Sequence, residues 1–155
     1  MEADDFVKAV QRVWHNHLQS KPFYKKQIAV VDDTPASVMA LCMHLEKRGG
    51  VVTRFGDGQH FVDHCAEHLP TDFDAVVLDY TMPGLDGLET LQSLAGAHEA
   101  LPPVVMYSTE ATQTDLKQSL LSAGAAACAE KRPACDEVIQ ELRKAMGCQL
   151  TATTS

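Results

Sequence analysis

Short apolar runs alternate along most of the chain with longer segments in which apolar residues recur at every third or fourth position. The short runs predict five β-strands, at residues 27–31, 51–55, 74–78, 104–107 and 125–129. In the longer segments that follow each run, the three- to four-residue spacing is typical of amphipathic helices with one buried face. The pattern therefore predicts five consecutive strand-helix units.

The segment after the first predicted strand shows where a helix begins and ends. The run from Asp32 to Thr34 consists of residue types that commonly cap a helix N-terminus, and Pro35 suits the first helical turn. Two glycines beginning at Gly49 follow the last apolar position, and glycine commonly ends helices. We therefore expect a helix between Pro35 and Gly49, with a capping side chain ahead of the proline.

The repeated units imply a doubly wound α/β fold. Strands that are apolar throughout are buried on both faces, and helical connections of this length join parallel strands through right-handed crossovers. We therefore expect a five-stranded parallel sheet with helices on both sides. In such sheets the functional crevice lies beyond the carboxyl ends of the strands, so residues that carry function are expected there.

The residues before the first predicted strand are expected to form an additional amphipathic helix. Its apolar residues recur at helical spacing and are Phe6, Val10, Val13, Trp14 and Leu18. This stripe needs cover, supplied either by the rest of the domain or by a second copy or another protein, as in a homodimer. The expected organisation is an N-terminal amphipathic helix and linker (1–26), one folded domain (27–148) and a flexible tail (149–155).

Composition and charge narrow the classes of protein that fit this fold. The chain has 155 residues, 45% hydrophobic and 22% charged, which is typical of one globular domain. Its formal net charge of −8 disfavours broad binding to nucleic acid or to an anionic membrane surface. Because no apolar run is long enough to cross a bilayer and the N-terminus lacks a secretory pattern, we expect a cytoplasmic protein. The five cysteines contain no C-x-x-C pair and are expected to be reduced.

Charged and hydroxyl side chains come at the ends of four of the five predicted strands. Asp32 and Asp33 follow the first strand, Asp79 the third, Ser108 the fourth and Lys131 the fifth. Two carboxylates about 4 Å apart repel each other by roughly 4 kcal/mol at an effective dielectric constant near 20, so this cluster needs a counter-charge. Lys131 supplies one, and Mg²⁺ is the common further choice where carboxylates and a phosphoryl group share a site. We therefore expect these strand ends to bind Mg²⁺.

Four motifs at these strand ends resemble the receiver domain of bacterial two-component response regulators. They are V-V-D-D-T at 30–34, V-V-L-D-Y-T-M-P-G-L-D-G at 76–87, V-M-Y-S-T-E-A at 105–111 and A-E-K at 129–131. The resemblance covers residues 27 to about 147, and the long motif combined with an upstream aspartate pair is specific. It implies the flavodoxin-like (βα)5 receiver fold.

The resemblance implies a phosphorelay function in signal transduction. Asp79 would accept a phosphoryl group from a phosphohistidine of a histidine kinase or histidine phosphotransfer protein. The implied Mg²⁺ ligands are Asp32, Asp33, Asp79 and Thr81, with Asp32 acting mostly through water and Thr81 through its main-chain carbonyl. Such a receiver assists only its own phosphorylation and dephosphorylation, so it is not expected to be an enzyme.

The same resemblance assigns roles to residues after the fourth and fifth strands. Lys131 would place a positive charge beside one phosphoryl oxygen, and Ser108 would hydrogen-bond another and act as the switch that reshapes a surface for an unidentified downstream protein. The family usually has an aromatic partner of this switch in the fifth strand, where this chain has Cys128. The family also tends to have a cis-proline directly after the lysine, whereas this chain reads Lys131-Arg132-Pro133. The sequence therefore does not decide whether the peptide bond before Pro133 is cis or trans.

Three further side chains are expected to modulate the lifetime of the phosphoryl group. In the family, residues at these positions border the path of the water that attacks the phosphorylated aspartate. They are Tyr80, Thr81 and Glu110.

The sequence is compatible with two settings for the domain, and two rival functions share part of its pattern. The chain is either a stand-alone regulator or the C-terminal receiver of a hybrid histidine kinase. An aspartate-nucleophile phosphatase also uses Mg²⁺, but it needs a second acid two residues after the nucleophile, where this chain has Thr81. A degenerate receiver that acts only as a scaffold is disfavoured by the set of Asp33, Asp79 and Lys131.

Overall fold

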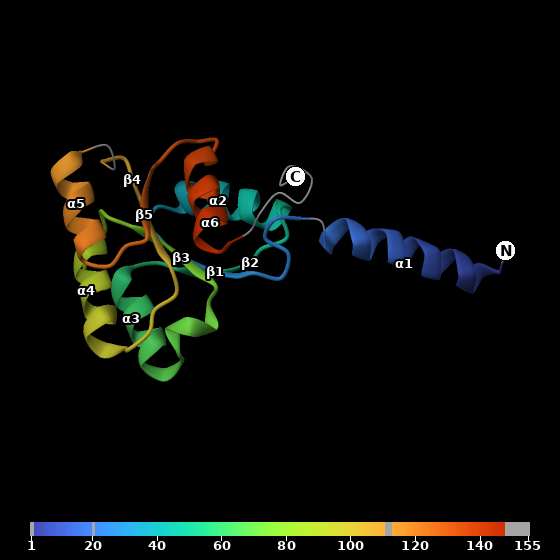
Figure 1. Ribbon diagram of the computed structural model, residues 1–155, viewed down its shortest axis with the longest axis horizontal. Helices are drawn as coiled ribbons and strands as arrows, with labels where there is room; N and C mark the ends of the chain where they lie inside the picture. Colours follow the sequence, from blue (N-terminus) through green and yellow to red (C-terminus); the bar gives the residue numbers. More distant parts are fainter. Residues whose placement is uncertain (1, 20, 111–112, 148–155) are drawn as a thin grey trace.

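Five parallel strands form one sheet with helices on both sides in the computed structural model, which describes residues 2–19, 21–110 and 113–147 (Figure 1). The strand order is β2-β1-β3-β4-β5, and each neighbouring pair is parallel. The strands are β1 (Gln27–Val31), β2 (Val51–Phe55), β3 (Ala75–Asp79), β4 (Val104–Ser108) and β5 (Ala127–Glu130). The predicted strands and the doubly wound fold are confirmed.

The helices that follow the strands lie in two layers, as Figure 1 shows. They are α2 (Pro35–Lys47), α3 (Gly58–Glu67), α4 (Gly87–Ala97), α5 (Thr114–Ser122) and α6 (Asp136–Ala145), with a short 3-10 helix, η1 (Pro70–Asp72). Apolar side chains of α2 and α6 form a core with one face of the sheet, and those of α3, α4 and α5 form a second core with the other face. Each connecting helix carries the chain back to the starting edge of the next parallel strand. Because crossovers are right-handed and the direction of strand addition reverses after β2, these helices divide between the two faces.

The three central strands carry the residues of interest to the same edge of the sheet. β3 and β4 are buried along their whole length, and β1 is buried from Ile28 onwards. β2 lies at one edge of the sheet and is largely exposed. Asp79 is the last residue of β3 and Ser108 the last residue of β4, while Asp32 directly follows β1. The rigid centre of the sheet therefore places these side chains.

The start of α2 corrects one detail of the sequence prediction. The helix begins at Pro35 as expected, but Thr34 at the N-cap makes no side-chain capping hydrogen bond. The main-chain N–H of Thr34 instead donates to Oδ1 of Asp32 over 2.9 Å. At the other end, Gly49 adopts a positive φ of 93°, which glycine tolerates without strain. The acidic pair therefore serves the site at the sheet edge rather than the helix cap.

An additional helix, α1 (Ala3–Gln19), precedes the sheet and projects away from it (Figure 1). The predicted helix is confirmed, but Phe6, Val10, Val13 and Trp14 are all exposed, so its apolar stripe does not brace the domain. Beyond α1, Phe23 is fully buried in the core beneath α2 and α6. Among the described residues, no helix combines the length and the apolar character needed to cross a membrane. Cys148, the side chain of Leu18 and the predicted tail 149–155 lie outside what the structure describes.

Candidate functional site

Three carboxylates meet beyond the carboxyl ends of β1 and β3. One oxygen from each of Asp32, Asp33 and Asp79 lies within 4.8 Å of the other two. Asp32 and Asp79 are each only 4% exposed, whereas Asp33 is exposed and gives the cluster access to solvent. This is the convergence that the sequence predicts from parallel strand ends.

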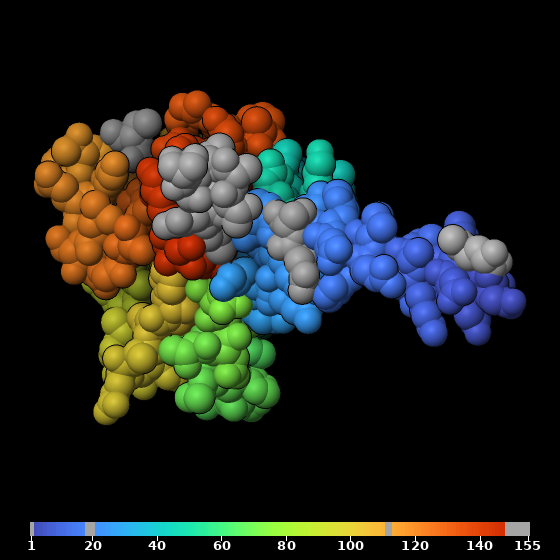
Figure 2. Space-filling model, turned by 45° about the vertical axis from the view of Figure 1, so that its right-hand side comes forward, coloured from blue at the N-terminus to red at the C-terminus, as the bar shows by residue number. Residues whose placement is uncertain are grey.

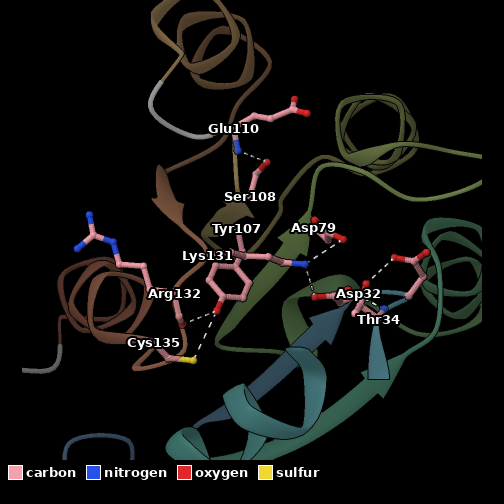
Figure 3. Close-up of polar contacts among 10 residues, drawn as sticks. Asp32, Thr34, Asp79, Tyr107, Ser108, Glu110, Lys131, Arg132 and Cys135 are labelled. Carbon is pink, nitrogen blue, oxygen red and sulfur yellow. Dashed lines mark hydrogen bonds and ion pairs between the residues drawn. The ribbon is translucent and has the colours of Figure 1, made fainter. Parts of the chain in front are cut away.

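Lys131 holds the two buried carboxylates together, as Figure 3 shows. Its Nζ lies 2.8 Å from Oδ2 of Asp32 and 3.3 Å from Oδ2 of Asp79. Its main-chain N–H donates to the carbonyl of Ser108 over 3.0 Å, which ties the loop after β5 to the end of β4. The described residues contain no cis peptide bond, so the peptide before Pro133 is trans and Lys131 still reaches both carboxylates.

The surroundings of Asp79 make its carboxylate easier to protonate. Burial, followed by the neighbouring charge of Asp32, raises the pKa of Asp79 to about 6, and Lys131 opposes this rise. Lys131 therefore offsets only part of the cost of burying the charge of Asp79 beside Asp32. A hard divalent cation with oxygen ligands fits this donor set, because two of the carboxylates are buried and the third is open to solvent.

The loop between β3 and α4 lies beside Asp79. The main-chain N–H of Gly87 donates to the carbonyl of Tyr80 over 2.7 Å, and Asp86 caps α4 through a reciprocal pair of hydrogen bonds with Glu89. A Cβ on Gly87 would lie 2.6 Å from the main-chain oxygen of Asp79, so only glycine allows this close approach. Thr81 is exposed. The loop therefore has a defined shape beside the carboxylates.

Ser108 lies at the end of β4 and is 2% exposed. Its Oγ accepts a hydrogen bond from the main-chain N–H of Glu110 over 3.0 Å (Figure 3). Because this bond uses the oxygen as an acceptor, the hydroxyl proton remains available for donation. The side chain of Glu110 points away from Asp79 in this view.

Cys128 lies in β5, opposite Met106 of β4, and is 7% exposed. It packs in the core between the sheet and helices α3 to α5, where burial raises the pKa of its thiol. Cys42, Cys65, Cys128 and Cys135 are all free and buried in the described part of the chain. Cys128 therefore occupies its strand position as a small apolar residue.

Tyr107 is a site residue that the sequence analysis did not identify. Nζ of Lys131 lies 5.4 Å from the centre of the Tyr107 ring, within the range of a cation–π contact. The Tyr107 hydroxyl lies 3.5 Å both from Sγ of Cys135 and from the main-chain oxygen of Arg132 (Figure 3). Tyr107 therefore supports the loop that carries Lys131. Its position next to Ser108 at the strand end was the available signal.

Replacing Tyr107 with phenylalanine tests this support. We expect the free energy of unfolding to fall by about 1 kcal/mol, because the variant keeps the ring beneath Lys131 but removes the buried hydroxyl from Cys135 and Arg132. Urea denaturation measures the change. Tyr24→Phe, at a half-buried tyrosine outside the site, is the matched control and should change the stability by less.

A surface hollow of about 360 Å³ adjoins the cluster on the side of Lys131. It lies between α2 and the loop after β5, and it is lined by Ala36, Ser37, Ala40, Tyr107, Thr109, Lys131, Arg132 and Pro133. The hollow leaves room for an external group beside Lys131.

Comparisons with known proteins agree with this geometry. KdpE, a transcriptional regulatory protein of Mycobacterium tuberculosis, is 34% identical over 119 residues, which are 77% of this chain and 50% of KdpE. PilH of Pseudomonas aeruginosa is 32% identical over 90 residues, which are 57% of this chain and 72% of PilH. The solved CheX-CheY-BeF3-Mg²⁺ complex from Borrelia burgdorferi matches with a TM-score of 0.70 and 25% identity, covering 78% of this chain and 89% of that one.

These relatives differ from the chain in length. The chain spans half or less of PfeR and KdpE, two of the curated relatives that it matches. The family model for the response regulator receiver domain matches residues 28–143, from β1 into α6. With the sheet order, the carboxylate cluster and this match in agreement, the chain belongs to the response regulator receiver domain family.

Proposed function

We propose that the protein is a phosphorelay receiver in which Asp79 accepts a phosphoryl group from a phosphohistidine. The observation that carries this proposal is the bridge formed by Lys131 between Asp32 and Asp79 at a solvent-accessible cluster. The donor is a histidine kinase or a histidine phosphotransfer protein. Access of its imidazole is supported by Asp33, which leaves the carboxylate cluster open to solvent.

The phosphoryl group passes directly from the donor imidazole to Asp79, so the protein has to align these two groups. A carboxylate oxygen of Asp79 attacks the phosphorus, the phosphorus–nitrogen bond breaks, and its electron pair stays on the imidazole of the donor. The transition state carries charge on the phosphoryl oxygens, so catalysis depends mainly on alignment and on nearby positive charge. Lys131 supplies that charge at 3.3 Å from the nucleophile. In this scheme the end of β3 holds the carboxylate of Asp79 and the loop after β5 holds the ammonium group of Lys131.

Mg²⁺ is proposed as the cofactor of this site. Asp32, Asp33, Asp79 and the main-chain carbonyl of Thr81 would hold it, with Asp32 contributing mostly through water. When bound, it would supply positive charge that offsets the carboxylates and the incoming phosphoryl oxygens. This assignment is supported by three converging carboxylates, one of them open to solvent. It is also supported by the Mg²⁺ and BeF3 named for the solved relative from Borrelia burgdorferi.

The proposed switch begins at Ser108. Its hydroxyl would donate to a phosphoryl oxygen on Asp79, and movement of Oγ toward that oxygen would weaken its hydrogen bond with the main-chain N–H of Glu110. Cys128 occupies the place of the usual aromatic partner, so the response in β5 would involve a small thiol. Tyr80, Thr81 and Glu110 are proposed to set the lifetime of the phosphoryl group. The output is a changed surface for a downstream protein that is not yet identified.

The setting of the receiver also belongs to the proposal. The same site chemistry would operate in a stand-alone regulator and in the C-terminal receiver of a hybrid histidine kinase. We place the protein in the cytoplasm in either case. The domain limits of 27–148, a helix and linker over 1–26 and a tail over 149–155 remain predictions. A second copy of the chain is a proposed partner through α1.

Phosphorylation with acetyl phosphate and Mg²⁺ tests the function directly. Intact mass should show one added phosphate on the wild type and none on Asp79→Asn, because the amide cannot act as the nucleophile. Asp72→Asn is the matched control, since Asp72 is exposed and precedes β3 at the opposite end of the strand from Asp79. Equal incorporation into wild type and Asp79→Asn would place the acceptor elsewhere, and no incorporation into the folded wild type would contradict the proposal.

A further inference from the structure

The apolar face of α1 takes no part in the proposed phosphoryl transfer. α1 extends from the body as a separate rod in the space-filling view (Figure 2). Its large apolar side chains are about half or more exposed: Phe6 61%, Val7 49%, Val10 51%, Val13 69% and Trp14 63%. Isolated helices of this length are marginal in water, so packing of this face against a partner would stabilise α1.

The spacing along α1 is that of a helix-pairing seam. Positions at alternating intervals of three and four residues are Ala3, Phe6, Val10, Val13 and His17, with Val7 and Trp14 beside them. The charged residues within the helix lie outside this seam and are Asp4, Asp5, Lys8 and Arg12. A seam without Asp, Glu, Lys or Arg, with these residues on the opposite face, is typical of helices that pack on other helices.

We infer that this seam pairs with the same seam of a second copy of the chain. Two other occupants fit the observations less well. The other described residues do not cover the seam, because these side chains remain exposed. A membrane surface would favour a helix rich in lysine and arginine, whereas the four charged residues within α1 cancel and the whole chain carries −8.

The exposed area is sufficient for a dimer. Large side chains present on the order of 150–250 Å² when aromatic and somewhat less when aliphatic, so the exposed fractions leave roughly 500 Å² of apolar surface per copy. Pairing two copies would bury up to roughly 1,000 Å², which is the size of a weak, reversible interface. We therefore expect a dimer that dissociates in the micromolar range.

Charge distribution selects the antiparallel arrangement of the two helices. Asp4 and Asp5 lie in the first turn of α1, whereas Lys21, Lys25 and Lys26 follow its C-terminal end. Parallel pairing would place acidic turn against acidic turn and bring two bodies of negative charge side by side. Antiparallel pairing places the acidic turn of one copy near the basic segment of the other and holds the two bodies apart.

The dimer would form independently of phosphorylation. α1 leads into the amino end of β1, whereas Asp32, Asp33 and Asp79 lie beyond the carboxyl ends of the strands. The two sites therefore occupy opposite edges of the sheet, and both clusters of a dimer remain open to donors. This inference extends the proposed function, but its test does not depend on Asp79.

Sedimentation of the full chain tests the dimer. The wild type should shift from monomer to dimer across the micromolar range, and Val10→Asp with Val13→Asp should weaken the dimer at least about tenfold. Lys8→Gln with Arg12→Gln is the matched control, because it changes the net charge equally but on the outer face and should leave the dissociation constant nearly unchanged. A monomeric wild type, a trimer, or equal effects of the two double variants would overturn the inference.

Two further measurements separate this inference from the proposed function. Asp79→Asn should dimerise like the wild type, whether or not Asp79 is the phosphoacceptor, and loss of its dimer would overturn the independence of the two sites. For orientation, a spin label on Asp4→Cys is used in a Cys148→Ser background, since the four described cysteines are buried. Antiparallel helices place the two labels more than about 20 Å apart, given a rise of about 1.5 Å per residue, and a distance below about 15 Å would show parallel pairing.

Discussion

Replacing Lys131 with methionine is expected to lower the free energy of unfolding by about 3 kcal/mol at pH 8 without divalent cations. The variant keeps most of the side-chain volume but removes the cation that lies 2.8 Å from Asp32 and 3.3 Å from Asp79. Two buried carboxylates then face each other without a counter-charge. Urea denaturation of the wild type and the variant measures the loss.

The same variant should recover stability in acid. Protonation of Asp79 removes one of the two facing charges, so the difference from the wild type is expected to shrink as the pH falls from 8 to 5. Lys144→Met is the matched control, because Lys144 is exposed and contacts Glu141 only at 3.5 Å. That control should change the stability by less than about 1 kcal/mol at either pH. Similar effects of the two lysine variants would contradict the importance of the buried bridge.

Replacing Asp79 with asparagine is expected to raise the free energy of unfolding by about 2 kcal/mol at pH 8 in the absence of Mg²⁺. Burial and the neighbouring charge of Asp32 raise the pKa of Asp79 to about 6 in the folded protein, well above its ordinary range. The folded state therefore binds this proton more tightly than the unfolded state does. Wild-type stability from this group is fully present below the unfolded pKa and is lost as the pH rises through about 6.

Asparagine has no proton to lose, so the variant should escape this loss. Its advantage over the wild type is expected at pH 8 and should fade as the pH drops through about 6 toward 4. Part of the gain is offset because the amide interacts less strongly with Lys131. The measurement is a series of urea denaturation curves from pH 4 to 8, with Asp72→Asn as control. A variant less stable than the wild type at pH 8 would show that the cluster is not under electrostatic strain.

The stability of Asp79→Asn also protects the functional test. A variant that is more stable than the wild type cannot fail to incorporate phosphate through unfolding. Its loss of incorporation is then attributable to the missing nucleophile. Asp79→Asn is thus expected to raise the free energy of unfolding while abolishing phosphoryl transfer.

Most of the fold could be predicted from local pattern because each βα unit has a short apolar run followed by apolar residues at helical spacing. Valine-rich runs and helical spacing predicted the strands and helices, and parallel topology then required the ends of β1, β3 and β4 to meet. The convergence of Asp32, Asp33 and Asp79 followed from connectivity alone. The cap of α2 was predicted incorrectly, because local propensity does not show that Asp32 pairs with Lys131 or that the hydroxyl of Thr34 is directed at Asp33.

Other features depended on distances that no local pattern contains. Tyr107 looks like an ordinary strand residue until the loop after β5 brings Lys131 over its ring and Cys135 beside its hydroxyl. Likewise, the spacing of α1 predicted an apolar stripe, but both a brace and a contact between molecules satisfied that pattern. Only the direction in which α1 leaves the body showed that the stripe remains exposed.

The sequence by itself thus determined the order of secondary structure elements, the parallel sheet and the gathering of acidic side chains at one edge, because periodicity and connectivity are local or topological properties. The tertiary structure decided which carboxylates are buried, which of them Lys131 bridges and which face of α1 lacks cover. These outcomes depend on packing and solvent exclusion among residues far apart in the chain. They also raise the pKa of Asp79 and leave Asp33 accessible.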